Sequence, residues 1–183
     1  MQEFPKPIQQ AHICTGTIGY SVHSKRRFPA LVMNTLLGDG MSSRLFQNIR
    51  ERYGFAYSVY SFLNMMRGTG SFGVYVGTDK KHVHDSLELI SVELEKLKTK
   101  PISKAELQRT KAQLKGNMLL GLESTSARMM RLGTGELYFG EFTTLETIAQ
   151  HIDSVTVDDV SEITRHLFRQ DEFSTIVFTP SEN

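Results

Sequence analysis

Three things are scarce in this chain of 183 residues: cysteine, an excess of charge of either sign, and long apolar runs. The single cysteine, Cys14, excludes an internal disulfide and a cysteine-based zinc site. Because Cys14 lies among alternating strand residues, we expect a buried and unreactive thiol. The 21 basic and 20 acidic residues give a net charge of +1, which offers no electrostatic basis for binding nucleic acid or an anionic membrane. No apolar run approaches the roughly 20 residues that span a bilayer.

Familiar catalytic motifs are also missing. The six histidines form no H-E-x-x-H or H-x-x-E-H pattern. His82 and His84 are two positions apart at an expected helix start, so their side chains would point roughly 200° apart and could not share a metal. There is no G-x-S-x-G and no phosphate-binding loop motif, and the glycine-rich segments 68–73 and 133–140 lack the context of a nucleotide loop. We therefore expect that this chain binds no metal or cofactor and holds no complete active site by itself.

The first ten residues bear on how the chain is divided. They contain no apolar segment typical of signal peptides, so no targeting signal is visible and the compartment stays open between cytoplasm and periplasm. Pro5 and Pro7 flank Lys6, and prolines in this arrangement favour an extended conformation. The pattern fits a linker over residues 1–10 that follows a preceding domain, and it fits an ordinary unstructured start equally well. Residues 11–183 show no second boundary and are expected to form one domain.

Hydrophobic periodicity predicts the order of helices and strands. Strands are expected at 11–18, 55–63, 71–76 and 173–179, the middle two as a hairpin. Helices are expected at 29–38, 45–53 and 80–98, then from 104 to 140 with breaks at Gly116 and Gly121, and finally at 145–152 and 157–168. Capping boxes are expected at Ser103–Glu106, Thr143–Glu146 and Thr156–Asp159. This order indicates an α+β fold: a largely antiparallel, mixed sheet with helices packed on one face.

The segment 36–60, LLGDGMSSRLFQNIRERYGFAYSVY, carries the candidate site. Arg50 lies four residues before Gly54, at the end of an expected helix, and Tyr57 lies three residues after it, on an expected strand. Four helical residues rise ~6 Å and three strand residues advance ~10 Å, so a reversal at Gly54 would bring the guanidinium and the phenol to one side of the turn. Both groups could then donate to a single oxygen atom. The same positions also suit an arginine that stabilises the helix dipole and a tyrosine half-buried in the sheet.

This segment closely resembles the second-half domain of the insulinase or pitrilysin family of zinc peptidases, which includes the mitochondrial processing peptidases. The family pattern there is a glycine-rich turn, then S-S-R-L-[FY], then an arginine, with a tyrosine seven residues later. Arg50 and Tyr57 have that spacing. Further along, ISKAELQRTKAQLKGNMLLGLES resembles the family's E-L-x-x-x-K-x-x-L helix, and IDSVTVDDV resembles its I-x-x-V-T-x-x-D-V. The resemblance extends from Ala11 to Pro180.

The resemblance implies a processing-peptidase-like metallohydrolase fold and a divided active site. In the family, the first half binds zinc through H-x-x-E-H and a later glutamate, and the second half closes over it like a clamshell. Carried over, Arg50 and Tyr57 would be catalytic residues that bind the scissile carbonyl of an unstructured peptide and stabilise its oxyanion. Zinc and the general base would come from an H-x-x-E-H domain or subunit, in a longer chain or in a homo- or heterodimer. The isolated chain is expected to be inactive.

Several positions depart from the family pattern. Asp39 interrupts the glycine run, Phe55 stands where leucine is common, and Thr179-Pro180 replaces the usual Gly-Pro. The long glycine-rich insertion of the regulatory processing-peptidase subunit is missing, which argues against a presequence-reading subunit. An alternative on the same fold is a non-catalytic assembly subunit, like the family's respiratory-complex core proteins. The missing zinc motif favours that alternative, and the retained Arg50–Tyr57 pair argues against it.

Overall fold

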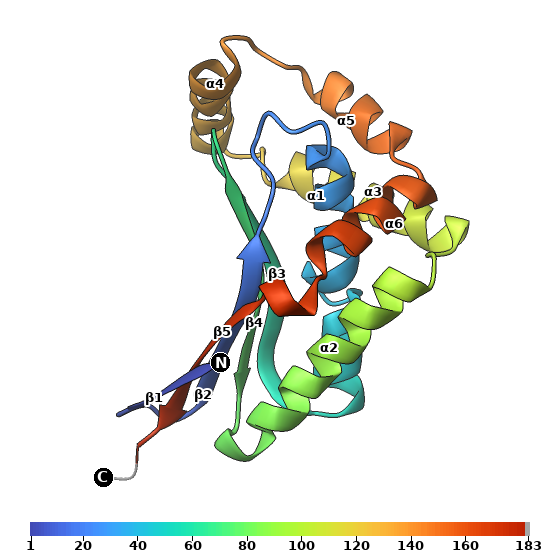
Figure 1. Cartoon of the computed structure of the whole chain (residues 1–183). Helices are drawn as coiled ribbons and strands as arrows, with labels where there is room; N and C mark the ends of the chain where they lie inside the picture. The colour runs from blue at the N-terminus through green and yellow to red at the C-terminus, as the bar shows by residue number, and fades with distance from the viewer. Residues whose placement is uncertain (182–183) are drawn as a thin grey trace.

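A five-stranded sheet with helices against one face organises residues 1–181, the part of the chain that the computed structural model describes (Figure 1). The strands are β1 (Gln2–Lys6), β2 (Ala11–Ile18), β3 (Ala56–Met65), β4 (Gly70–Thr78) and β5 (Ser174–Pro180). Their order in the sheet is β1-β5-β2-β4-β3. β1 runs parallel to β5, and the other neighbouring strands are antiparallel. The predicted α+β class with a largely antiparallel, mixed sheet is confirmed.

The helices follow the predicted order. They are α1 (Arg27–Gly38), the π-helix η1 (Phe46–Arg52), α2 (Val83–Thr99), α3 (Lys104–Leu120), α4 (Thr125–Phe139), α5 (Leu145–Ser154) and α6 (Val157–Leu167). Short 3₁₀ turns, η2 (Lys80–His82) and η3 (Gln170–Glu172), precede α2 and β5. Among residues 1–181, no helix is long and apolar enough to cross a membrane.

The core lies between the sheet and the helices. Side chains that point inward from the strands are almost completely shielded from solvent, for example Ile13, Phe72, Val74, Val76 and Val177. Figure 1 shows α1, α2 and α6 on this side of the sheet. Strand residues alternate between the two faces, so the alternate positions of the same strands point away from the helices. Burying the inward set supplies the main driving force for docking the helices.

The first ten residues differ from the prediction. Residues 2–6 form β1, which pairs with β5 from Gln2 opposite Ile176 to Lys6 opposite Pro180, so the expected linker over residues 1–10 is wrong for this part. Proline has no backbone N–H and cannot donate a hydrogen bond to a neighbouring strand. An edge strand tolerates it, because the backbone groups on the open side of the strand pair with no neighbour. Pro5 can therefore extend the sheet. The presence of a preceding domain stays a prediction.

Two further local predictions were wrong. Gly116 does not break the helix: α3 continues through it and ends at Leu120, with Gly121 as its C-cap. A single glycine costs a helix interior only about 1 kcal/mol, which a helix of 17 residues with Leu107 in the core tolerates. The cap of α5 is Thr144 rather than Thr143, because the Thr144 hydroxyl accepts the N–H of Thr147.

Of the other two predicted capping boxes, one is confirmed in full and the other in half. Thr156 and Asp159 form a complete capping box, in which each side chain accepts the other's backbone N–H. At the start of α3, Ser103 accepts the N–H of Glu106 as predicted. The Glu106 carboxylate, however, binds Arg44 instead of the Ser103 N–H. Half of that box is therefore replaced by a tertiary ion pair.

Cys14 is exposed, which contradicts the expected burial. It faces away from the helices because the inward positions of β2 are Ala11, Ile13 and Thr15. Tyr75 and Ile176 lie opposite it on the two neighbouring strands. Partial burial between these neighbours raises the pKa of the Cys14 thiol.

We expect the Cys14 thiol to react with iodoacetamide in the native protein, slowly at neutral pH and faster as the pH rises. The thiolate is the nucleophile, and a raised pKa means that less thiolate is present at a given pH. Mass spectrometry of alkylation rates between about pH 7 and pH 10 should give an apparent pKa above that of a cysteine in an unfolded peptide. Alkylation that requires denaturant would contradict the exposed position.

Candidate functional site

Arg50 lies in the π-helix η1, between α1 and β3. Ile49, beside it, is completely buried and anchors the segment in the core. Gly54 has a φ of +66° and donates its N–H to the Arg50 carbonyl at 3.1 Å, which ends the helix with a left-handed cap. The Arg50 side chain is exposed, and its guanidinium carbon lies 5.0 Å from the centre of the Phe46 ring. π-helical turns are rare and often occur at functional sites.

Tyr57 is the extra residue of a β-bulge. Ala56 pairs with Thr78 and Ser58 with Gly77, so Tyr57 has no partner on β4. Ala56 and Val59 point into the core, which leaves Tyr57 and Ser58 together on the outer face. The Tyr57 side chain is 63% exposed. Bulges bend the strand and change the direction of side chains, and they are common beside active sites.

The two predicted site residues therefore flank the Gly54 reversal as expected, each on an irregular piece of backbone. Within residues 1–181, neither the Arg50 guanidinium nor the Tyr57 hydroxyl makes a hydrogen bond or an ion pair with the chain. Both side chains are exposed, and no hydrogen bond joins them within the described residues. This arrangement leaves both groups able to bind an oxygen atom of a bound molecule.

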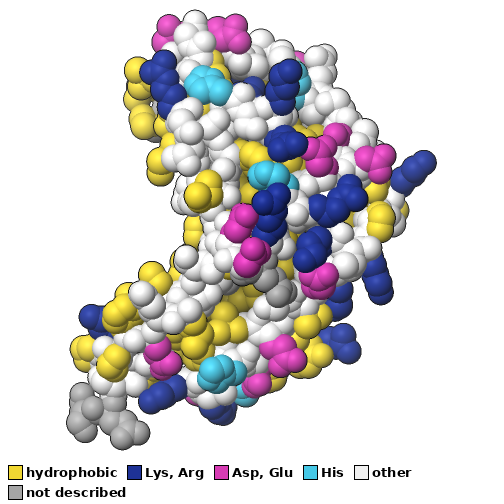
Figure 2. Space-filling view, in the orientation of Figure 1, with side chains coloured by type: hydrophobic (Ala, Val, Ile, Leu, Met, Phe, Trp, Pro, Cys, Tyr) yellow, Lys and Arg dark blue, Asp and Glu magenta, His cyan; other side chains and the backbone are white. Residues whose placement is uncertain are grey.

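The uncovered face of the sheet continues from Tyr57. Tyr60 stacks on Tyr75 with ring centres 5.0 Å apart, and the Tyr75 hydroxyl lies 2.6 Å from Nδ1 of His12. Ile176 and Phe178 of β5 extend the surface and are 45% and 41% exposed. In Figure 2, apolar side chains border a hollow on this side of the molecule.

Formal charge on this face lies at its β1 edge, where Lys6 Nζ is 5.9 Å from the centre of the Phe178 ring. The four strands β2, β3, β4 and β5 contain no aspartate, glutamate, lysine or arginine. The sequence alone missed Tyr60 and Tyr75 as candidate binding residues. Strands without any charged residue, on a sheet with one open face, are the signal that could have found them.

The described residues also bear on whether this chain could hold a metal ion. Residues 1–181 contain no group of three or more histidine, cysteine, aspartate or glutamate side chains placed to hold a metal ion. Tetrahedral zinc sites in peptidases take three protein ligands. The described side chains therefore offer no such set of three ligands for a zinc ion.

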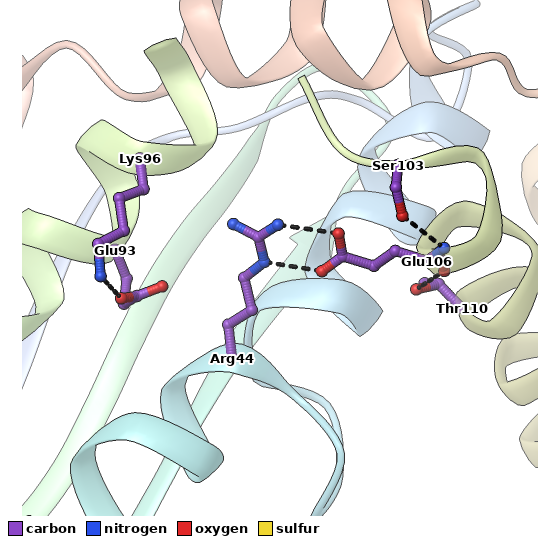
Figure 3. Close-up of polar contacts among 6 residues, drawn as sticks. All are labelled: Arg44, Glu93, Lys96, Ser103, Glu106 and Thr110. Atoms are coloured by element: carbon purple, nitrogen blue, oxygen red, sulfur yellow. Dashed lines mark hydrogen bonds and ion pairs between the residues drawn. The ribbon is translucent and has the colours of Figure 1, made fainter. Parts of the chain in front are cut away.

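An ion pair holds the residues just before η1 against α3 (Figure 3). Arg44 donates from Nε to one oxygen of Glu106 at 2.9 Å and from Nη2 to the other at 3.0 Å. Both side chains are 24% exposed. Glu93 on α2, shown beside Arg44 in Figure 3, pairs with Lys96 instead. The two-pronged Arg44–Glu106 contact restrains the segment that carries Arg50.

A double-mutant cycle on Arg44→Ala and Glu106→Ala should give a coupling free energy of about 1–3 kcal/mol, because the pair is largely shielded and doubly hydrogen-bonded. Urea unfolding of the four proteins measures it. The exposed Arg169–Glu172 pair is the matched control and should couple by less than about 1 kcal/mol. Equal coupling in the two cycles would contradict a special role for Arg44.

The fold and this open face define a known class of domain. Residues 3–114 match the model of the family described as the peptidase M16 inactive domain. That match covers more than half of the chain, so the chain belongs to this family. The resemblance to the insulinase and pitrilysin zinc peptidases is thereby confirmed.

Curated relatives agree with the family. An uncharacterized zinc protease of Bacillus subtilis strain 168 is 38% identical over 178 residues, which cover 97% of this chain and 43% of that protein. An uncharacterized zinc protease of Streptomyces coelicolor is 42% identical over 160 residues, which cover 87% of this chain and 35% of that protein. The chain therefore spans less than half the length of these relatives.

Solved structures agree with the fold. A crystal structure of a peptidase M16 inactive domain from Pseudomonas fluorescens superposes with a TM-score of 0.85 at 22% identity, covering 99% of this chain and 43% of that one. At that identity the likeness concerns the fold alone. The processing-peptidase-like architecture that the sequence predicted is thus confirmed.

Proposed function

We propose that this chain is the second-half domain of a zinc-dependent endopeptidase. It binds the scissile carbonyl of a peptide through the Arg50 guanidinium and the Tyr57 hydroxyl. Zinc and the general base are supplied by an H-x-x-E-H domain of the same parent protein or by another subunit. The observation that carries the proposal is the pair itself: two exposed donors without partners among residues 1–181, seven residues apart, on a π-helix and a β-bulge.

The chemistry of the pair suits carbonyl activation. When a nucleophile adds to a peptide carbonyl, negative charge develops on its oxygen, and fixed donors bind that oxyanion more strongly than the neutral carbonyl. Arg50 supplies a permanent positive charge, and Tyr57 supplies a neutral O–H donor. Neither group has to give up a hydrogen bond to the described part of the chain before binding. The domain thus contributes transition-state stabilisation and no nucleophile.

The part of the sheet face formed by β2 to β5, which have no charged residues, supports a peptide substrate. An extended peptide presents apolar and aromatic side chains to solvent, and the Tyr60–Tyr75 stack offers them a surface that continues from Tyr57. The second half would close over the zinc-bearing half like a clamshell, with the peptide between them. Such closure excludes water and strengthens each hydrogen bond to the developing charge.

Reconstitution tests this assignment. The chain is mixed with the zinc-bearing H-x-x-E-H part of its parent protein, and cleavage of an unstructured, neutral peptide is followed together with complex formation by size-exclusion chromatography. We expect that neither polypeptide cleaves alone and that the complex does. Full activity of the H-x-x-E-H part by itself would contradict the proposal. A stable complex that cleaves no unfolded peptide would instead favour a non-catalytic assembly subunit.

A further inference from the structure

An apolar pocket of about 400 Å³ lies between α1, the far end of β3, α4 and the start of α5. Its apolar walls are formed by Val22, Phe28, Leu31, Met65, Met130, Phe139, Phe142 and Ile148. Met65 ends β3 eight residues after Tyr57, a distance of roughly 26 Å along an extended strand. The pocket is therefore separate from the candidate site, and its volume falls within the range of small-molecule binding sites.

Arg27 is the first of two guanidinium groups in this pocket. Its central carbon lies 4.6 Å from the centre of the Phe28 ring and 4.8 Å from that of Phe139. Nη1 donates to the Val22 carbonyl at 3.0 Å. Burial among these groups lowers the pKa of Arg27, although a guanidinium remains charged near neutral pH. Within residues 1–181 the bond to Val22 is the only hydrogen bond of the Arg27 guanidinium, so its other N–H groups are available to a bound molecule.

Arg131 on α4 supplies the second guanidinium group of the pocket. Its guanidinium carbon lies 5.7 Å from the centre of the Phe142 ring, and Nη2 donates to the Thr143 carbonyl at 2.8 Å. Arg131 also borders a neighbouring cavity that Glu146 lines. Interactions with its own backbone N–H and with the Thr144 hydroxyl lower the pKa of the Glu146 carboxyl. No ion pair joins Glu146 to Arg131 in the described part of the chain.

Neither pocket arginine has an acidic partner within residues 1–181, in contrast to Arg44 with Glu106. A guanidinium carries five N–H donors, and a single backbone carbonyl accounts for one of them in each case. A partly desolvated cation without a counter-charge is unfavourable. An apolar wall with two such cations is therefore complementary to a molecule with one anionic end and an apolar body.

We propose that this pocket binds a carboxylate with an apolar tail. The carboxylate accepts hydrogen bonds from Arg27 and Arg131, and the tail packs against Phe28, Leu31 and Met65. Guanidinium and carboxylate have matching planar geometry, so the contact combines charge and direction. A medium-chain fatty acid and the carboxyl end of a peptide with an apolar last residue share this chemistry. The proposal stands independently of the peptidase role.

Calorimetric titration of the full chain with decanoate tests it, with decanol and decylamine as matched ligands. We expect decanoate to bind one to one and the other two at least about tenfold more weakly, since a hydrogen bond to a charged group is lost. Arg27→Gln and Arg131→Gln should each weaken decanoate binding by about tenfold and leave decanol binding nearly unchanged. Arg128→Gln, on the same helix but outside the pocket, is the control and should bind decanoate normally.

A second variant keeps the test independent of the arginines. Gly135 lines the pocket, and a Cβ there would meet only the Glu141 carbonyl oxygen at 3.6 Å, an ordinary contact. Gly135→Leu should therefore fold, fill the pocket and abolish decanoate binding.

A peptide with a C-terminal leucine, compared with its amidated form, separates the two sources. If the peptide binds only with its free carboxylate, the natural ligand is the carboxyl end of a peptide. If decanoate binds and the peptide does not, the natural ligand is a fatty acid. Equal binding of decanoate, decanol and decylamine, or no binding of either carboxylate, would overturn the proposal.

Discussion

Replacing Tyr57 with phenylalanine should lower kcat for peptide cleavage by about 10²- to 10³-fold in the assembled peptidase. The phenol O–H is expected to strengthen its hydrogen bond only as the carbonyl oxygen becomes negative, so KM should change little. Tyr57 is 63% exposed and makes no hydrogen bond within the described chain, and folding stability should therefore be unaffected. Steady-state kinetics of the complex, with thermal unfolding in parallel, measures both effects.

Arg50→Ala should produce a loss of the same order, and Arg50→Lys should recover only part of it, because an ammonium group lacks the planar donor pair. Two neighbours serve as controls. Tyr53 is 45% exposed and lies in the same turn, and the Arg52 guanidinium stacks on its ring. Tyr53→Phe and Arg52→Ala should leave kcat within about twofold of the parent protein, since surface substitutions away from the site have small effects. If Arg52→Ala and Arg50→Ala lowered kcat equally, the loss would come from removing positive surface charge in general and not from a specific role of Arg50.

A large loss of stability is expected on substitution of Gly38, the last residue of α1. An added Cβ there would lie 2.7 Å from the Ser61 Cβ on β3, and also inside contact distance of the Ser61 backbone nitrogen. The Ser61 hydroxyl donates to the Asn34 carbonyl at 3.1 Å, which fixes helix and strand at this separation. Gly38→Ala should therefore lower the free energy of unfolding by about 1–3 kcal/mol or more, because neither backbone can move without disturbing the core.

Gly116→Ala is the matched control with the opposite sign. Nothing lies within 4 Å of a Cβ at this position in α3. Alanine should therefore raise the free energy of unfolding by about 0.5–1 kcal/mol, through the lower conformational entropy of the unfolded chain. Urea denaturation with a common slope measures both variants. A Gly38→Ala protein as stable as its parent would mean that α1 and β3 are not packed as closely as described.

Sequence periodicity predicted most elements because their apolar faces are regular. The π-helical form of η1 could not be read in this way. Leu45 and Ile49 are buried at a spacing that an α-helix also gives, and the change concerns only which carbonyl each N–H reaches. The bulge at Tyr57 could not be predicted for a similar reason. One additional residue shifts the alternation of inward and outward side chains along the strand by only a single position.

Other features depend on contacts between distant parts of the chain. β1 was missed because its partner β5 lies more than 170 residues away, and two prolines disguise it. Cys14 was misplaced because alternation shows that a strand has two faces without showing which face the helices cover. The pocket around Arg27 and Arg131 arises from packing α4 beside α1, and no local pattern encodes that contact.

The candidate pair itself was visible in the sequence, because its spacing of seven residues around Gly54 is local. Its chemical role was supplied by the family resemblance. The structure adds that both side chains are exposed and without partners among residues 1–181. It also shows that the open sheet face continues from Tyr57 to the stacked rings of Tyr60 and Tyr75, on two strands without charged residues.

The central claim is that Arg50 and Tyr57 bind the oxyanion of the transition state. Its most direct test measures the inhibition constant of a phosphinic peptide, whose anionic tetrahedral centre mimics that state, in the assembled peptidase and its variants. We predict that Arg50→Lys, Arg50→Ala and Tyr57→Phe weaken inhibitor binding by the same factors by which they lower kcat/KM for the matching substrate. Variants that lose kcat/KM but bind the inhibitor as tightly as the parent protein would contradict the claim.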